Sequence, residues 1–199
     1  MVKLDEISVT VDGDYAEEVR LRNIVTMGLG FSAMTRLYES ASKDEFHRRI
    51  LGVVKELFQA KSREEYVQIH STFCEKEIGR IKLAKKGTAA SYGQIAKTLD
   101  VVMKVAVYYA QLPDCRKAQE LTKWLNAAVD TRMMAYLNKY LNEKHPQKSK
   151  LPKTVEKVKK KEHTYIQDVV RDFIKEKHQN KIYPAQFDDI YWRWLNRKP

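Results

Sequence analysis

The chain has 199 residues, enough for one substantial core but too few for two full domains. It contains only 7 glycines and 5 prolines, so the regularly spaced turn signals of an all-β fold are missing. The formal net charge of +11 is uneven: residues 1–83 carry 13 basic and 14 acidic side chains, residues 84–145 carry 10 and 5, and residues 146–199 carry 14 and 7. The positive excess in the second half indicates an anionic partner such as nucleic acid.

The N-terminal region is predicted to begin with a short strand or an extended arm at residues 2–13, where apolar and polar residues alternate loosely. A helical pattern follows from Asp14 to about Tyr38, with Gly28 and Gly30 inside it. No strand leads directly into these glycines, and neither a third glycine nor a Lys-Ser/Thr pair follows at the required spacing, so a phosphate-binding loop is not expected. We interpret them instead as a kink or as a close approach of two helices.

Two Ser-x-x-Glu sequences predict the starts of the next two helices. Ser42 with Glu45 and Ser62 with Glu65 have the spacing of a capping box, in which each side chain bonds to a backbone donor of the first turn. Apolar residues recur after both at helical spacing. Each helix is therefore expected to turn one face to the core.

A central helix is predicted from Ser91 to Leu112. Ser91 and Gln94 form its capping box, and one face is apolar along the whole length. From Val105 to Ala110 every side is apolar, so this part must be covered all round. The polar residues of the opposite face come early, at Gln94, Lys97, Thr98, Asp100 and Lys104. Lys104 also makes the apolar run too short for a membrane span, which needs about 20 apolar residues.

The remaining pattern predicts a helix over residues 114–142, either one long rod or a rod broken once. A basic helix starts at Pro152, and a short aromatic helix near Trp194 is expected to dock on the bundle. The predicted fold is all-α. It consists of an up-and-down bundle of five or six helices at 1–143, a linker at 144–152 and a basic C-terminal helical extension at 153–199.

Seven lysines concentrate in this extension and the linker before it. Phosphate contacts by such a cluster bind nucleic acid with little sequence preference and with steep salt dependence. The alternative interpretation is a solvated linker that keeps the protein soluble. The candidate nucleic-acid-binding lysines are Lys148, Lys150, Lys153, Lys157, Lys159, Lys160 and Lys161.

The C-terminal helix mixes aromatic residues and cations, a composition typical of surfaces on which bases stack. Packing on the core is the competing explanation for the aromatic residues. The expected packing stripe consists of Phe187, Ile190, Tyr191 and Trp194. Trp192 projects away from this stripe, so we select it as a stacking or partner-binding residue, together with Arg193 and Arg197.

One catalytic hypothesis comes from a short motif. Arg63 and His70, and also Arg171 and His178, are each separated by six residues. This spacing resembles the motif of the HEPN ribonucleases, which are compact helical domains. The resemblance covers the fold class and two residues, and it implies metal-independent RNA cleavage with Arg171 and His178 in catalytic roles, because this pair follows the lysine cluster.

No metal site or cofactor is predicted, because the chain has neither Cys-x-x-Cys nor His-Glu-x-x-His. Cys74 and Cys115 lie far apart, and the chain opens without an apolar signal segment, so a reduced, cytoplasmic protein is expected. The leading hypothesis is a nucleic-acid-associated protein, with the ribonuclease as one alternative. A module that binds an acidic protein is the other, and the sequence leaves open DNA or RNA as ligand and whether the domain forms a homodimer.

Overall fold

The computed structural model of the chain describes residues 13–85 and 87–196, so all of the predicted N-terminal arm except Gly13 lies outside it. The described residues form helices and connecting loops, with isolated bridges but no strand. This confirms the all-α class. The α-helices are α1 (Gly13–Phe31), α2 (Ser40–Phe58), α3 (Arg63–Glu77), α4 (Tyr92–Met103), α5 (Cys115–Thr122), α6 (Thr131–Lys144), α7 (Lys160–His178) and α8 (Pro184–Asn196). The short helical segments are η2 (Ala33–Leu37), η3 (Lys104–Tyr109) and η4 (Val155–Lys157).

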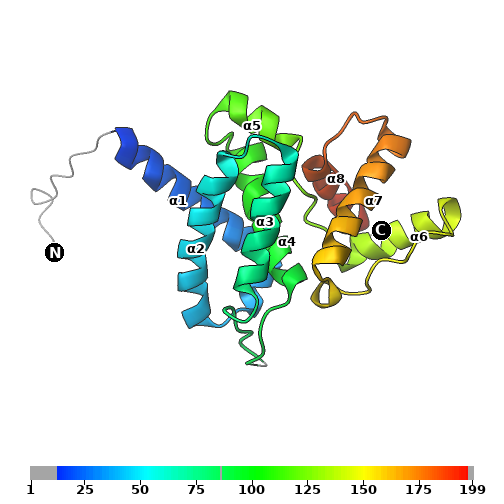
Figure 1. Cartoon of the computed structure of the whole chain (residues 1–199), viewed down its shortest axis with the longest axis horizontal. Helices are drawn as coiled ribbons and strands as arrows, with labels where there is room; N and C mark the ends of the chain where they lie inside the picture. The colour runs from blue at the N-terminus through cyan, green and yellow to red at the C-terminus, as the bar shows by residue number, and fades with distance from the viewer. Residues whose placement is uncertain (1–12, 86, 197–199) are drawn as a thin grey trace, which may run out of the picture.

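The helices pack in two groups (Figure 1). Apolar residues of α1 to α5, with Ala185 of α8, form one buried cluster, and those of α6, α7 and the rest of α8 form a second. The predicted division at residues 144–152 stays a prediction, but the apolar contacts group α6 with the two helices that follow it. None of the described helices has both the length and the apolar character needed to cross a membrane.

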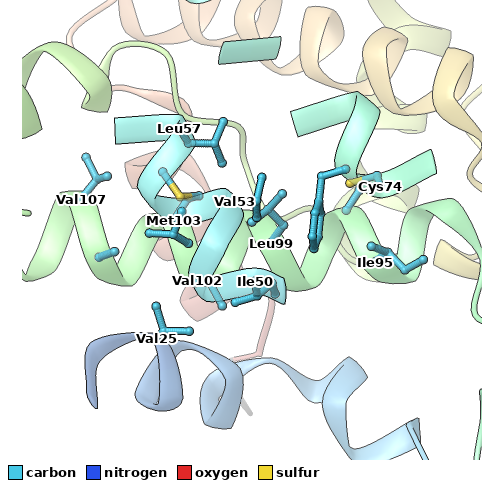
Figure 2. Close-up of a cluster of buried hydrophobic side chains, with 14 of the residues drawn as sticks. Val25, Ile50, Val53, Leu57, Cys74, Ile95, Leu99, Val102, Met103 and Val107 are labelled. Carbon is cyan, nitrogen blue, oxygen red and sulfur yellow. The ribbon is translucent and has the colours of Figure 1, made fainter. Parts of the chain in front are cut away.

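Helix α4 lies at the centre of the first cluster, as the sequence predicts. Its Ser91–Gln94 capping box is present, with both reciprocal hydrogen bonds. Figure 2 shows Leu99 and Met103 of this helix among side chains of α1, α2 and α3. After Met103 the helix widens into η3, which has π-helical geometry and ends at Tyr109.

The predicted polar face of α4 is buried rather than exposed. Thr98 has no exposed surface, and Asp100 is only 2% exposed. Two different neighbours cover these residues. The Thr98 hydroxyl lies 2.9 Å from the Tyr38 hydroxyl within the first group, whereas Asp100 meets the second group by bonding to His163 of α7. A polar stripe here marks an internal polar contact between two helices.

The helix starts are partly as predicted. Ser62 caps α3 by accepting from the backbone of Glu65. The capping box predicted at Ser42 does not form, because α2 already begins at Ser40. The Ser42 hydroxyl instead accepts from the backbone N–H of Lys82, 3.3 Å away. Tertiary contact with the loop before α4 has replaced the local cap.

Gly28 is the position where two helices approach closely. A Cβ atom at this position would lie 2.9 Å from the Cα of Val102 in α4, whereas the same atom at Gly30 would meet nothing within 4 Å. The interpretation as a close approach is therefore confirmed for Gly28. Real Cβ atoms do not come this near to a backbone atom, so glycine lets α1 contact α4 directly.

The C-terminal region differs in detail from the prediction. The segment 114–142 is two helices, because residues 123–130 are not helical and Asp130 caps α6. The basic helix α7 begins at Lys160, later than predicted, because the chain before it is extended except for the single turn η4. That extended chain is held in place: Leu151 is buried, and its N–H donates to the side chain of Asn138, 2.7 Å away.

Candidate functional sites: a basic segment, a groove and a buried histidine cluster

The lysine cluster lies on an ordered segment, which we call the basic segment (Lys148–Lys161). Three apolar side chains, Leu151, Val155 and Val158, anchor this segment in the second cluster. Six of the seven lysines are exposed, and Lys148 is partly buried. The apolar residues point inward, so the lysines between them point to solvent.

Two of these lysines form ion pairs. Lys148 lies 2.8 Å from the Asp172 carboxylate, and Lys160 lies 2.9 Å from that of Glu75 in α3. Within the described chain, the other five lysines form no ion pair that neutralises them. They are Lys150, Lys153, Lys157, Lys159 and Lys161.

The basic segment runs past the ends of two helices of the first group. Lys160 contacts the last turn of α3, and Val158 accepts from Gly93 in the first turn of α4. The loop that joins these two helix ends carries further exposed cations, at Arg80, Lys82 and Lys85. Positive charge from two distant parts of the sequence therefore lies at one end of the molecule. We call the basic segment together with the α3–α4 loop the basic end.

Trp192 and Arg193 lie at a different feature, a groove of about 750 Å³ between α1, α4, η3 and α8. None of the seven lysines lines this groove. Trp192 is 50% exposed, but Ile190 and Trp194 of the predicted packing stripe are 46% and 54% exposed, so exposure does not distinguish Trp192 and its role stays a prediction. Phe31, on the facing helix, is 67% exposed. Arg197 lies outside the described residues.

The floor of the groove is charged. Lys104 pairs with Asp188 and, at 2.8 Å, with Asp189 of α8. Burial lowers the pKa of Lys104, but the two carboxylates more than offset this effect and the net shift is upward. Burial also lowers the pKa of Lys97, which lines the same groove.

The two residues of the ribonuclease hypothesis have separate partners. Arg171 donates to the carbonyl oxygens of Trp124 and Leu125, at 3.2 and 3.1 Å. These bonds attach α7 to the loop that follows α5. Burial and the positive charge of Arg63 lower the pKa of Arg171 to about 10, so it stays charged at neutral pH. His178 lies 2.9 Å from the Tyr191 hydroxyl. The catalytic pairing of Arg171 with His178 stays a prediction.

A polar cluster lies between the two groups of helices, and the sequence motifs single out only one of its members, His70, in the Arg63–His70 spacing. His70 from α3 and His163 from α7 each approach one oxygen of the Asp100 carboxylate in α4, with Nε2–oxygen distances of 2.9 and 3.1 Å. Asn126 donates to the same carboxylate from 3.2 Å. The two imidazole rings are nearly parallel, with centroids 5.3 Å apart. We call His70, Asp100 and His163 the buried triad.

The buried triad keeps a carboxylate charged inside the protein. Burial raises the pKa of Asp100, but the charges and hydrogen bonds of the two histidines more than compensate, and the net pKa lies well below its ordinary value. An isolated buried carboxylate would be very unfavourable, so these donors are required. Beside the triad, the buried Tyr66 hydroxyl has no hydrogen-bond partner within the described protein.

Comparison with known proteins gives no further assignment: no family model, no curated protein and no solved structure matches this chain.

Proposed function

We propose that the protein binds the phosphate backbone of nucleic acid through its basic end. The observation that carries this proposal is the five lysines of the basic segment that form no ion pair with the described residues, held outward by Leu151, Val155 and Val158. A flexible tail of the same composition would lose conformational entropy on binding, whereas this segment is already ordered. Exposed, preorganised cations without internal partners suit phosphate contacts.

The loop between α3 and α4 extends this surface. Arg80, Lys82 and Lys85 belong to the end of the molecule that Lys160 and Val158 contact. A surface built from two chain segments can follow a phosphate backbone over a longer path than one segment can. Phosphate contacts carry no sequence information, so affinity without sequence preference is expected.

The test is fluorescence-polarisation binding of labelled single- and double-stranded DNA and RNA over a series of salt concentrations. Replacing Lys150, Lys153, Lys157 and Lys161 by glutamine removes four cations but keeps the ion pairs of Lys148 and Lys160. If all four contact duplex DNA, the slope of log K against log salt becomes shallower by about 3.6. Wild type is expected to bind tightly at low salt, and this variant weakly.

A matched control separates the surface from net charge. Replacing Lys55, Lys123, Lys139 and Lys177 by glutamine changes the charge equally at exposed positions outside the basic end. We expect this control to retain most of the affinity of wild type. Equal losses in both variants, or no binding by wild type at physiological salt, would exclude the basic end as a phosphate-binding surface. The two remaining interpretations of these lysines would then be binding to an acidic protein and a solvated segment that keeps the protein soluble.

A further inference from the structure

The buried triad is assembled from three helices that are distant in sequence. Its residues come from α3, α4 and α7, and their three candidate ligand atoms lie within 4.8 Å of one another. We propose that His70, Asp100 and His163 together bind one divalent transition-metal ion, with Zn²⁺ as the expected occupant. This inference does not depend on nucleic-acid binding.

The distances bring the three side chains within reach of one metal ion. Tetrahedral zinc, with bonds of about 2.0–2.1 Å to nitrogen and oxygen, places neighbouring ligand atoms about 3.3 Å apart. The Nε2 atoms of His70 and His163 lie 2.9 and 3.1 Å from different oxygens of the Asp100 carboxylate, and the three candidate ligand atoms lie within 4.8 Å of one another. To bind one ion, the two contacts open by a few tenths of an ångström and the more widely spaced atoms move closer by up to about 1.5 Å.

The surroundings also hold the ligands in suitable orientations. A histidine that coordinates through Nε2 carries its proton on Nδ1 and usually donates it to a neighbouring group. Nδ1 of His70 lies 3.8 Å from the sulfur of Cys74, one turn further along α3, and the thiol is in position to accept this proton. Asn126 holds the carboxylate from the other side.

The type of ion follows from the donor atoms. Two imidazoles and one carboxylate are typical of zinc and of non-haem iron sites, whereas Mg²⁺ and Ca²⁺ prefer oxygen ligands alone. A space of about 10 Å³ beside Asp100 and His163 is also lined by Gln167 and Lys97. This volume is about the size needed for one water molecule, which would complete a four-coordinate ion.

The first experiment uses the full chain, freed of metal by unfolding in chelator and then refolded. Co²⁺ serves as the spectroscopic probe, because tetrahedral Co²⁺ absorbs strongly in the visible region. We expect one Co²⁺ per chain, a tetrahedral spectrum, its loss on adding Zn²⁺, and a higher thermal midpoint with Zn²⁺ than with chelator.

Variants locate the ion. In His70→Gln and His163→Gln the amide still donates to Asp100, and the affinity is expected to fall by more than about 100-fold, beyond the loss seen for outer-shell changes. His47→Gln removes a histidine outside the cluster, and Cys115→Ser removes the exposed thiol. Both controls are expected to bind Co²⁺ as wild type does.

X-ray absorption by the Zn²⁺-loaded wild type gives an answer even if the histidine variants do not fold. Scattering from about two imidazoles per zinc is expected. Any of three results would overturn the proposal: no imidazole scattering, an unchanged metal affinity in both folded glutamine variants, or a folded wild type that neither retains Zn²⁺ nor is stabilised by it. The triad would then be a hydrogen-bonded contact between helices only.

Discussion

At the scale of single residues, Gly93 shows how one missing side chain holds two parts of the chain together. It lies in the first turn of α4, where its N–H bonds to Val158. A Cβ atom here would lie 2.3 Å from the carbonyl oxygen of Val155 and 2.6 Å from the Cβ of Val158. Neither atom belongs to the free end of a flexible side chain, so neither can move aside easily.

Gly93→Ala is therefore expected to destabilise the protein by about 3 kcal/mol, the upper part of the range for overpacking. Urea unfolding followed by circular dichroism measures this change. Gly52→Ala is the matched control, because its Cβ would meet nothing within 4 Å on an exposed face of α2. There alanine should stabilise by about 0.5–1 kcal/mol, since it lowers the entropy of the unfolded chain. Equal effects at the two glycines would contradict the close approach.

The buried triad marks the limit of sequence reasoning at this scale. The Ser91–Gln94 box is predictable because both partners lie within one turn, whereas His70 and His163 reach Asp100 across 30 and 63 residues. From the sequence alone, a polar residue within a helix is predicted to be exposed, because the helix that covers it is not known. The one available signal is the polar stripe on a helix that is otherwise apolar on all sides.

At the scale of elements, α8 is joined to the first group of helices through charge. Lys104 of η3 lies between Asp188 and Asp189, and all three side chains are at least partly buried. Removing one member of a buried ion pair is more costly than replacing the whole pair, because it leaves the remaining charge unpaired.

Lys104→Met is expected to destabilise the protein by about 3–5 kcal/mol, because it leaves the Asp188 carboxylate buried without its cation. Combining it with Asp188→Asn and Asp189→Asn should restore a large part of this loss. Urea unfolding gives the stabilities, and the fluorescence of Trp192 and Trp194 reports whether α8 stays docked. Additive losses in the combined variant would show that the contact contributes little.

The helical elements themselves are largely predictable, and their boundaries are less so. Apolar spacing locates α3, α4 and α8, because each packs several apolar side chains of its predicted face into a core, although α3 also buries His70 on that face. It misplaces the start of α7, since Val155 and Val158 have helical spacing, but Val155 belongs to the single turn η4 and Val158 to extended chain, and both pack on α4. The side chain of Gln167 likewise holds residue Ala127 outside any helix, with hydrogen bonds to its N–H and its carbonyl oxygen.

At the scale of the whole molecule, the two apolar clusters are linked by polar contacts. Asp100 bonds to His163, Arg171 bonds to the carbonyl oxygen of Leu125, and Gly93 bonds to Val158. Separating the clusters would leave a charged carboxylate and several backbone groups without partners, each costing about 1–3 kcal/mol unless water reaches it. The clusters should therefore stabilise each other.

We accordingly expect the chain to unfold in one cooperative transition. Tryptophan reporters test this for each cluster separately. With Trp192 and Trp194 changed to phenylalanine, Trp124 reports on the first cluster, against which it packs. With Trp124 and Trp192 changed to phenylalanine, Trp194 reports on the second cluster, where its ring packs against Tyr136. In each variant, the urea midpoint from fluorescence is expected to coincide with the midpoint from circular dichroism. A separate, earlier transition of Trp194 would show that the clusters are independent units, and that the polar contacts between them are too weak to couple their folding.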